Sequence, residues 1–151
     1  MNVSYTLLNN LALTAGYAYM HDNVRQDIKL SATDSNYWDN LVPYKTTTRN
    51  YLFDLNYSPK KSINLSGGIS HTVSQGTFYT SAPALDSLAS YSALKVREIT
   101  YNALGEYHFK SGVTAGLQYR YSTIKDMLGN SYDDVTDGRV SIVLLTISKK
   151  W

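Results

Sequence analysis

The sequence predicts an all-β fold in which antiparallel strands run up and down in chain order. Three observations predict it. Apolar and polar residues alternate with a period of two, short connections alternate with long ones, and most aromatic residues are tyrosines, 14 Tyr against 3 Phe and 2 Trp. Successive side chains of a strand point to opposite sides, so this alternation is typical of strands with two unlike faces.

Seven strands are expected, and the turn residues help to delimit them. The first two are joined by Asn9-Asn10, because asparagine accepts the positive φ of tight hairpins. Pro59 has no N–H for a ladder, so we expect it in the turn between the third and fourth strands. Lys110-Ser111-Gly112 predicts another tight turn between the fifth and sixth strands. The expected ranges are 2–8, 11–21, 48–58, 62–75, 95–109, 112–124 and 138–151.

The pattern is clearest in segment 62–75. Ile63, Leu65 and Ile69 fall on one side, and small, mostly polar residues fall on the other. Segments 48–58 and 112–124 show the same division, and segment 11–21 shares a weak repeat with 62–75 and 112–124. The connections that separate the resulting hairpins are long and rich in Asp, Asn, Ser and Thr. We expect them as loops at one end of the strands: 22–47, 76–94 and 125–137.

Composition excludes several classes of protein. Lys and Arg total 14 against 12 Asp and Glu, which leaves a net charge of +2 and no electrostatic footprint for nucleic acid. The chain has no cysteine, hence no disulfide framework or thiolate metal site. No window supplies the roughly 20 apolar residues of a spanning helix. A membrane protein with this sequence must therefore cross as a barrel.

Tyrosines near strand ends favour a membrane over a protein core as the neighbour of the apolar side. Tyr51 and Tyr57 are separated by ~20 Å of strand, a little less than the ~25 Å between the aromatic girdles of outer-membrane barrels. The opposite side holds Gly, Ser, Asn and Gln, which suit a crowded or water-filled lumen. The residues expected at the membrane interfaces are Tyr19, Tyr51, Tyr57, Tyr101, Tyr107, Phe109, Tyr121 and Trp151.

Segment 139–151 resembles the last strand of bacterial outer-membrane β-barrel proteins. Trp151, Ile147, Leu145 and Val143 match the family's terminal aromatic and alternating apolar positions, whereas Lys149 departs from them. The resemblance implies an antiparallel up-and-down transmembrane β-barrel in a Gram-negative outer membrane, with the lipid bilayer and, through the last strand, the barrel assembly machinery as partners. Because short turns lie on the periplasmic side, the first strand would descend from the loop side. We therefore expect residues 1–151 to form one barrel domain or the C-terminal segment of a larger barrel.

The ionisable residues expected to face the lumen are Asp54, Glu106, His108 and Arg120. Such groups can form a charge constriction in a pore, or pair with one another and brace the wall. The apolar residues Val140, Ile142 and Leu144 occupy the lumen side of the last strand, which a wet lumen does not explain. They fit either a plug or a strand buried on both sides.

No enzymatic activity, metal or cofactor is expected. Ser70 and His71 are adjacent in a strand and point to opposite faces, and no serine is placed opposite Glu106 and His108. None of the three histidines has a zinc-site spacing. The acidic loop containing Asp126, Asp133, Asp134 and Asp137 lacks the calcium-binding register and is expected to be solvated.

The expected function is a passive, porin-like pore or a transmembrane scaffold. One alternative is a barrel that holds a multihaem cytochrome in an electron conduit, because segment 57–65 is weakly similar to turns of those barrels. That function needs a periplasmic or lumen-bound partner, since the chain has no haem-attachment motif of its own. The other alternative is a soluble β-sandwich that binds carbohydrate through its tyrosines.

Overall fold

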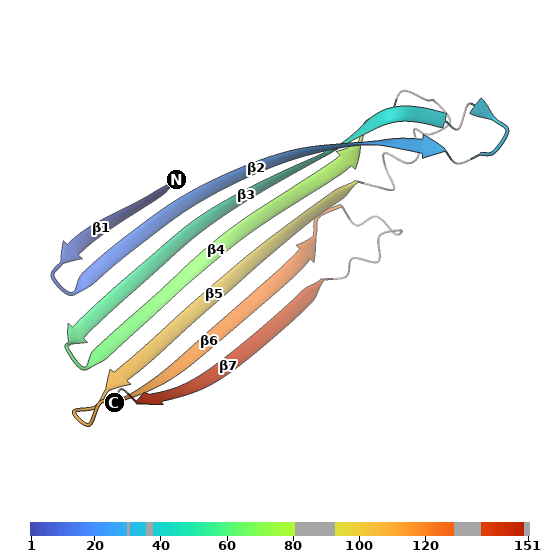
Figure 1. Ribbon diagram of the computed structural model, residues 1–151. Coiled ribbons are helices and arrows are strands. Elements are labelled where there is room, and N and C mark those ends of the chain that lie inside the picture. The colour runs from blue at the N-terminus through green and yellow to red at the C-terminus, as the bar shows by residue number, and fades with distance from the viewer. Residues whose placement is uncertain (30, 36–37, 81–92, 129–136, 150–151) are drawn as a thin grey trace.

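The chain forms a single sheet of seven strands in the computed structural model, which describes residues 1–29, 31–35, 38–80, 93–128 and 137–149 (Figure 1). Every strand is antiparallel to the next along the chain. The strands are β1 (Asn2–Leu8), β2 (Leu11–Lys29), β3 (Trp38–Lys60), β4 (Ile63–Phe78), β5 (Leu94–His108), β6 (Val113–Asp126) and β7 (Gly138–Lys149). The predicted all-β class and up-and-down order are confirmed.

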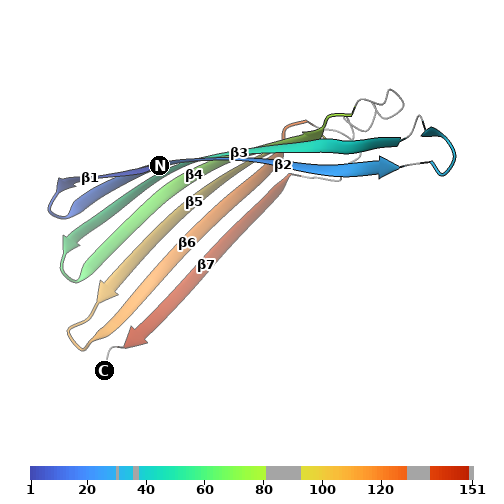
Figure 2. The ribbon, with the colours of Figure 1, turned by 45° about the horizontal axis from the view of Figure 1, so that its top comes forward.

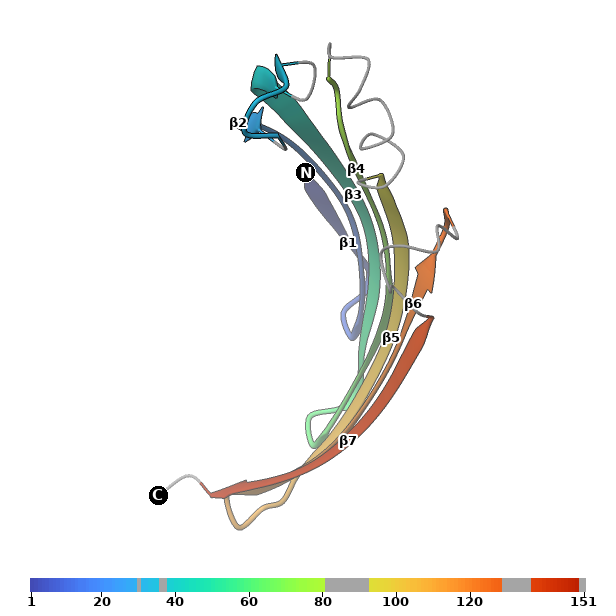
Figure 3. The ribbon, with the colours of Figure 1, turned by 90° about the vertical axis from the view of Figure 1, so that its right-hand side faces the viewer.

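The sheet is curved and open (Figure 3). β1 and β7 are its outer strands, and within the described part of the chain each pairs on one side only. Of the two expected alternatives, a single closed barrel domain is therefore not observed among the described residues. Closure requires strand number, tilt and stagger to agree, and seven strands with this curvature leave an open arc.

The predicted loop over 22–47 is wrong in most of its length. β2 continues to Lys29 and β3 begins at Trp38, and the two pair through this region apart from a bulge between Gln26 and Ile28. The ladder between β3 and β4 ends at Tyr44. From there toward Trp38, β3 pairs in a ladder with β2 alone, and the two strands form the two-stranded arm visible in Figure 2. Polar residues occupy both faces of this part of the strands, so a period of two is not visible in the sequence.

The end of the arm has a local backbone irregularity. Leu41 has a φ of 55°, and its N–H donates to Asp27 Oδ1 at 2.8 Å. A non-glycine residue with this φ needs compensating contacts. Next to it, Val42 is only 1% exposed and is the one buried hydrophobic side chain among the described residues.

The short turns follow the prediction with one correction. Gly112 has a φ of 80° in the turn before β6, a conformation that glycine adopts without steric cost. Pro59, by contrast, lies within β3, and the turn occupies Lys61 and Ser62. The register shifts between Tyr57 and Lys60, so Pro59 sits in an irregularity of the ladder where its missing N–H is tolerated.

The other two predicted loops lie partly outside the described residues. β4 takes the first residues of 76–94, up to Phe78, and β5 begins at Leu94. β6 ends at Asp126, near the predicted start of loop 125–137. Positions 81–92 and 129–136 are not described, and neither is Trp151.

The sheet has one layer. Thr100 and Val42 are the buried side chains of the described chain, and no second sheet covers Ile63, Leu65 or Ile69. A soluble sandwich would place a second layer there, so the described residues lack the feature that this alternative requires. Within the same residues, no helix is long and apolar enough to cross a lipid bilayer.

Candidate functional site

The register divides the sheet into two continuous faces. Cross-strand partners have numbers of the same parity through the regular part of every ladder, for example Phe53 with Ile69 and Ile69 with Tyr101. Because partners share a face, odd-numbered residues form one face and even-numbered residues the other. We name the first, with Leu55, Ile69 and Leu117, the apolar face, and the second the polar face.

The apolar face is well exposed and has a central band without charge. Leu145 and Ile147 on β7 are 72% and 73% exposed, and Leu117 on β6 is 54% exposed. Between Arg97 and Tyr107 on β5, the odd positions hold Ile99, Tyr101, Ala103 and Gly105. The corresponding stretches of β3, β6 and β7 likewise contain no Asp, Glu, Lys or Arg at odd positions. An uncharged apolar surface of this extent is uncommon on a monomeric soluble protein.

The predicted interface aromatics share this face. Tyr19, Tyr51, Tyr57, Tyr101, Tyr107 and Tyr121 all occupy odd ladder positions. Toward the long-loop end, ring centroids lie 5.1 Å apart in Tyr17–Tyr51 and 6.4 Å apart in Tyr101–Tyr121. Toward the short-turn end, the ring centroids of Tyr107 and Phe109 lie 4.6 Å apart in an edge-to-face arrangement. These aromatic rings therefore lie toward the two ends of the uncharged band, whereas Tyr5 and Tyr119 lie near its middle.

The polar face carries smaller and more covered side chains. On β4, Ser66, Gly68 and Ser70 are half-buried, although their neighbours Leu65 and Ile69 on the other face are exposed. Side chains converge on the inside of a curved sheet and diverge on its outside. The polar face is therefore the concave one in Figure 3, and the apolar face is convex.

All four predicted lumen-facing residues lie on the polar face, but they do not form ion pairs with one another. Asp54, Gly68, Asn102 and Arg120 are successive partners in one cross-strand row. Asp54 and Arg120 are three strands apart, about 14 Å between backbones. Gly68 leaves room between them: a Cβ there would lie 1.9 Å from Asp54 Oδ1 and 2.7 Å from Asn102 Oδ1. The hypothesis that the four brace the wall by mutual pairing does not fit this geometry.

His108 belongs to a hydrogen-bonded chain at the short-turn end. Its Nε2 lies 3.0 Å from Asn64 Nδ2, and its Nδ1 lies 2.9 Å from Thr114 Oγ1. Ser58 donates to Asn64 Oδ1 at 2.9 Å. These contacts link the ends of β3 and β4 to β5 and β6, so His108 lies in a chain of hydrogen bonds across four neighbouring strands.

Sequence reasoning missed a carboxylate on the same face. Thr100 Oγ1 donates to Glu98 Oε1 at 3.1 Å, and Ser122 Oγ donates to the same oxygen at 2.9 Å. The two hydroxyls also contact each other, and Thr100 is only 9% exposed. The even parity of Glu98, shared with Glu106, could have identified it from the sequence.

With Glu98 included, the polar face is acidic. Arg120 is its only arginine, and no lysine lies in the regular part of its described ladders. Its carboxylates are Asp22, Asp54, Glu98, Glu106 and Asp126.

β7 differs from the other strands because it is apolar and exposed on both faces. Val140, Ile142 and Leu144 lie on the polar face and are 52%, 39% and 50% exposed. In the described part of the chain, neither a plug nor a second layer covers them. Of the two predicted explanations, burial on both sides is therefore not observed within this sheet.

Neither the serine–histidine pair considered from the sequence nor a metal-binding cluster is assembled among the described residues. Ser70 and His71 lie on opposite faces of β4, as their spacing predicts. No group of three or more His, Cys, Asp or Glu side chains in the described ranges is positioned to bind a metal ion. In the predicted acidic loop, Asp137 Oδ1 accepts a hydrogen bond from the Asp126 backbone at 3.1 Å, and Asp133 and Asp134 lie outside the described residues.

Comparison with protein-family models, curated protein sequences and solved structures gives no significant match to this chain.

Proposed function

We propose that this sheet is part of the wall of a transmembrane β-barrel in a bacterial outer membrane and that it lines a passive, porin-like pore. One observation carries the proposal: a single-layered sheet exposes a broad apolar face whose central band contains no charged residue. In water, such a face would be an aggregation liability. Against hydrocarbon it is favourable, because Arg or Lys at the bilayer midplane would cost about 2–4 kcal/mol.

The dimensions fit a bilayer. Ten residues separate Arg97 from Tyr107 on β5, which corresponds to ~33 Å along the strand. At the ~40° tilt of barrel strands this distance projects to about 25 Å, the height of the apolar band of outer-membrane barrels. The barrel would close through further strands beside β1 and β7, contributed by a longer chain or by other copies of this one.

The concave polar face would line the lumen. Its small side chains are joined across strands by hydrogen bonds such as Asn50 Nδ2 to Thr72 Oγ1 at 2.7 Å and Thr48 Oγ1 to Ser74 Oγ at 3.0 Å. An acidic lumen attracts cations, so this part of the wall favours their passage over that of anions.

Two measurements test the proposal. Electrophoresis without boiling should show a folded band that shifts on heating, and the protein should require detergent or vesicles to remain dispersed. In planar bilayers, the protein should produce steady conductance that is larger for cations than for anions. A protein that stays monodisperse without detergent and neither inserts into vesicles nor conducts would refute the proposal.

The apolar strip on the polar face of β7 favours a second candidate, a barrel that encloses another protein. Val140, Ile142 and Leu144 would then contact the enclosed partner. A multihaem cytochrome is the partner expected from the turn similarity. Copurification from a native membrane with haem absorbance would support this candidate, and conductance by the isolated protein would favour the open pore.

A further inference from the structure

Most lysine and arginine residues of the sheet lie on the apolar face, on the long-loop side of its uncharged band. In the ladders up to the bulge between Gln26 and Ile28 of β2, no Asp or Glu occupies a position on this face. At the long-loop end the same face carries Arg25, Lys45, Arg49, Lys95, Arg97, Lys125 and Arg139. The face that avoids charge in its centre is thus strongly basic along one margin.

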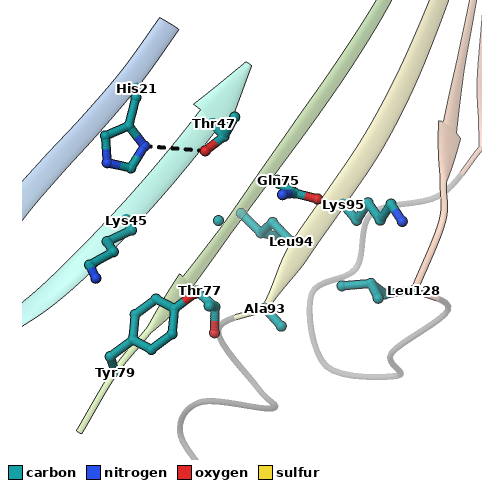
Figure 4. Close-up of a pocket in the computed structure, with 11 residues that line it drawn as sticks. His21, Lys45, Thr47, Gln75, Thr77, Tyr79, Ala93, Leu94, Lys95 and Leu128 are labelled. Carbon is teal, nitrogen blue, oxygen red and sulfur yellow. Dashed lines mark hydrogen bonds between the residues drawn. The ribbon is translucent and has the colours of Figure 1, made fainter. Parts of the chain in front are cut away.

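A pocket of about 330 Å³ lies in this basic margin (Figure 4). His21, Thr47, Gln75 and Lys95 form one cross-strand row along its floor, and Lys45 lies two residues from Thr47 on β3. Lysine, histidine, threonine and glutamine can all donate hydrogen bonds to an anion. None of the described lining residues is acidic.

Two arginines lie directly between the pocket and the apolar band. Arg49 and Arg97 both pair with Val73, one from each side, so their backbones are about 10 Å apart. The short side chain of Val73 leaves space for the two guanidinium groups to approach one anion. Arginine binds phosphate through two parallel hydrogen bonds, whereas lysine acts as a compact point charge. Neither arginine forms an ion pair with another described residue.

The depth of this cluster matches a lipid head group. Tyr51 and Tyr101 lie two and four residues closer to the middle of the strands than Arg49 and Arg97. Tyrosines of outer-membrane barrels mark the boundary between acyl chains and head groups. A lipid whose acyl chains rest on Phe53, Ile69 and Tyr101 would therefore place its phosphate beside the arginines.

From this arrangement we propose that Arg49 and Arg97, with Lys45 and Lys95 in the pocket, bind the phosphate of a lipid head group at the long-loop end of the apolar face. The proposal rests on the proposed function, since it needs the apolar face to meet a bilayer. It adds a specific anionic lipid as the partner of this margin.

The test compares lipid retention by native mass spectrometry after reconstitution of the full chain. Vesicles contain phosphatidylcholine alone or with a minority of phosphatidic acid, whose head group is a bare phosphate. One variant carries Arg49→Gln and Arg97→Gln, and a second carries Lys45→Gln and Lys95→Gln. The matched control, Lys60→Gln with Lys61→Gln, removes two cations at the short-turn end.

We expect the wild type and the control to retain phosphatidic acid in preference to phosphatidylcholine. Each Lys or Arg near an anionic surface raises the affinity for that surface about fivefold. Either double variant should therefore reduce the preference for phosphatidic acid by up to ~25-fold. Folding is monitored by the heat-dependent shift in electrophoresis. If one variant fails to fold, the other tests the proposal.

Three outcomes overturn the inference. A protein that inserts but shows no preference for phosphatidic acid refutes it while leaving the proposed function intact. Equal loss in the control variant shows that only total charge matters and refutes it in the same way. Failure of the wild type to insert into either vesicle refutes the proposed function and the inference together.

Discussion

Leu117 and Gln118 are neighbours on β6 that point to opposite faces of the sheet. Leu117 lies among the band residues Gly105 and Leu145, and it is 54% exposed. Gln118 lies at the same depth on the polar face. Substitution of each residue by arginine therefore places the same charge at the same depth in two different surroundings.

The expected difference follows from the solvent on each side. Leu117→Arg puts a charge inside the apolar band, ~5 Å from the level of Tyr107, where it costs about 1–2 kcal/mol, between the values for the bilayer midplane and for its interfaces. This corresponds to roughly a 5- to 30-fold change in the folding equilibrium constant. If the apolar face met water instead, an exposed substitution would change stability by only about 0.5 kcal/mol or less. Gln118→Arg should show this smaller effect, because a wet lumen solvates the charge.

The assay is guanidinium unfolding of the vesicle-inserted protein, followed by tryptophan fluorescence and extrapolated linearly to water. We expect the unfolding free energy to fall by about 1–2 kcal/mol for Leu117→Arg and to change little for Gln118→Arg. Equal losses in the two variants would refute it, as would a larger loss for Gln118→Arg.

Three further predictions follow from the polar face and the glycines. His108→Ala removes two side-chain hydrogen bonds and should lower the unfolding free energy by about 1–3 kcal/mol, measured by the same titration. Gly68→Ala should cost about 1–3 kcal/mol because its methyl group would overlap Asp54, whereas Gly138→Ala, with open space around it, should be near neutral; similar midpoints would contradict this. Glu98→Gln should reduce the cation-to-anion permeability ratio in planar bilayers, and an unchanged reversal potential would show that Glu98 does not face the conducting path.

The strand order and the two faces could be predicted from the sequence because the central strands have unlike sides. In β4, the contrast between Leu65 or Ile69 and their serine and glycine neighbours defines both the strand and its orientation. Short turns such as the one at Gly112 then fix the register between neighbouring strands. Parity alone placed Asp54 and Arg120 on one face, as the structure confirms.

The β2–β3 arm could not be predicted in this way. Between Asn23 and Pro43 polar residues are interspersed with apolar ones such as Val24 and Leu41, so the strands pair without a regular hydrophobic period. The pattern also gives no information on which side chains reach one another. The contacts of Glu98 with Thr100 and Ser122 depend on register across two strands, which a single sequence does not specify.

The claim that the apolar face contacts hydrocarbon can be tested most directly with single cysteines. The chain has no cysteine, so Leu65→Cys and Ser66→Cys each place one thiol at the same depth on β4, on opposite faces. A fluorophore attached at either position can be probed in vesicles with a quencher carried on the acyl chains. We predict strong quenching at position 65 and weak quenching at position 66. Equal quenching at both positions, or quenching only at position 66, would contradict the assignment of the two faces.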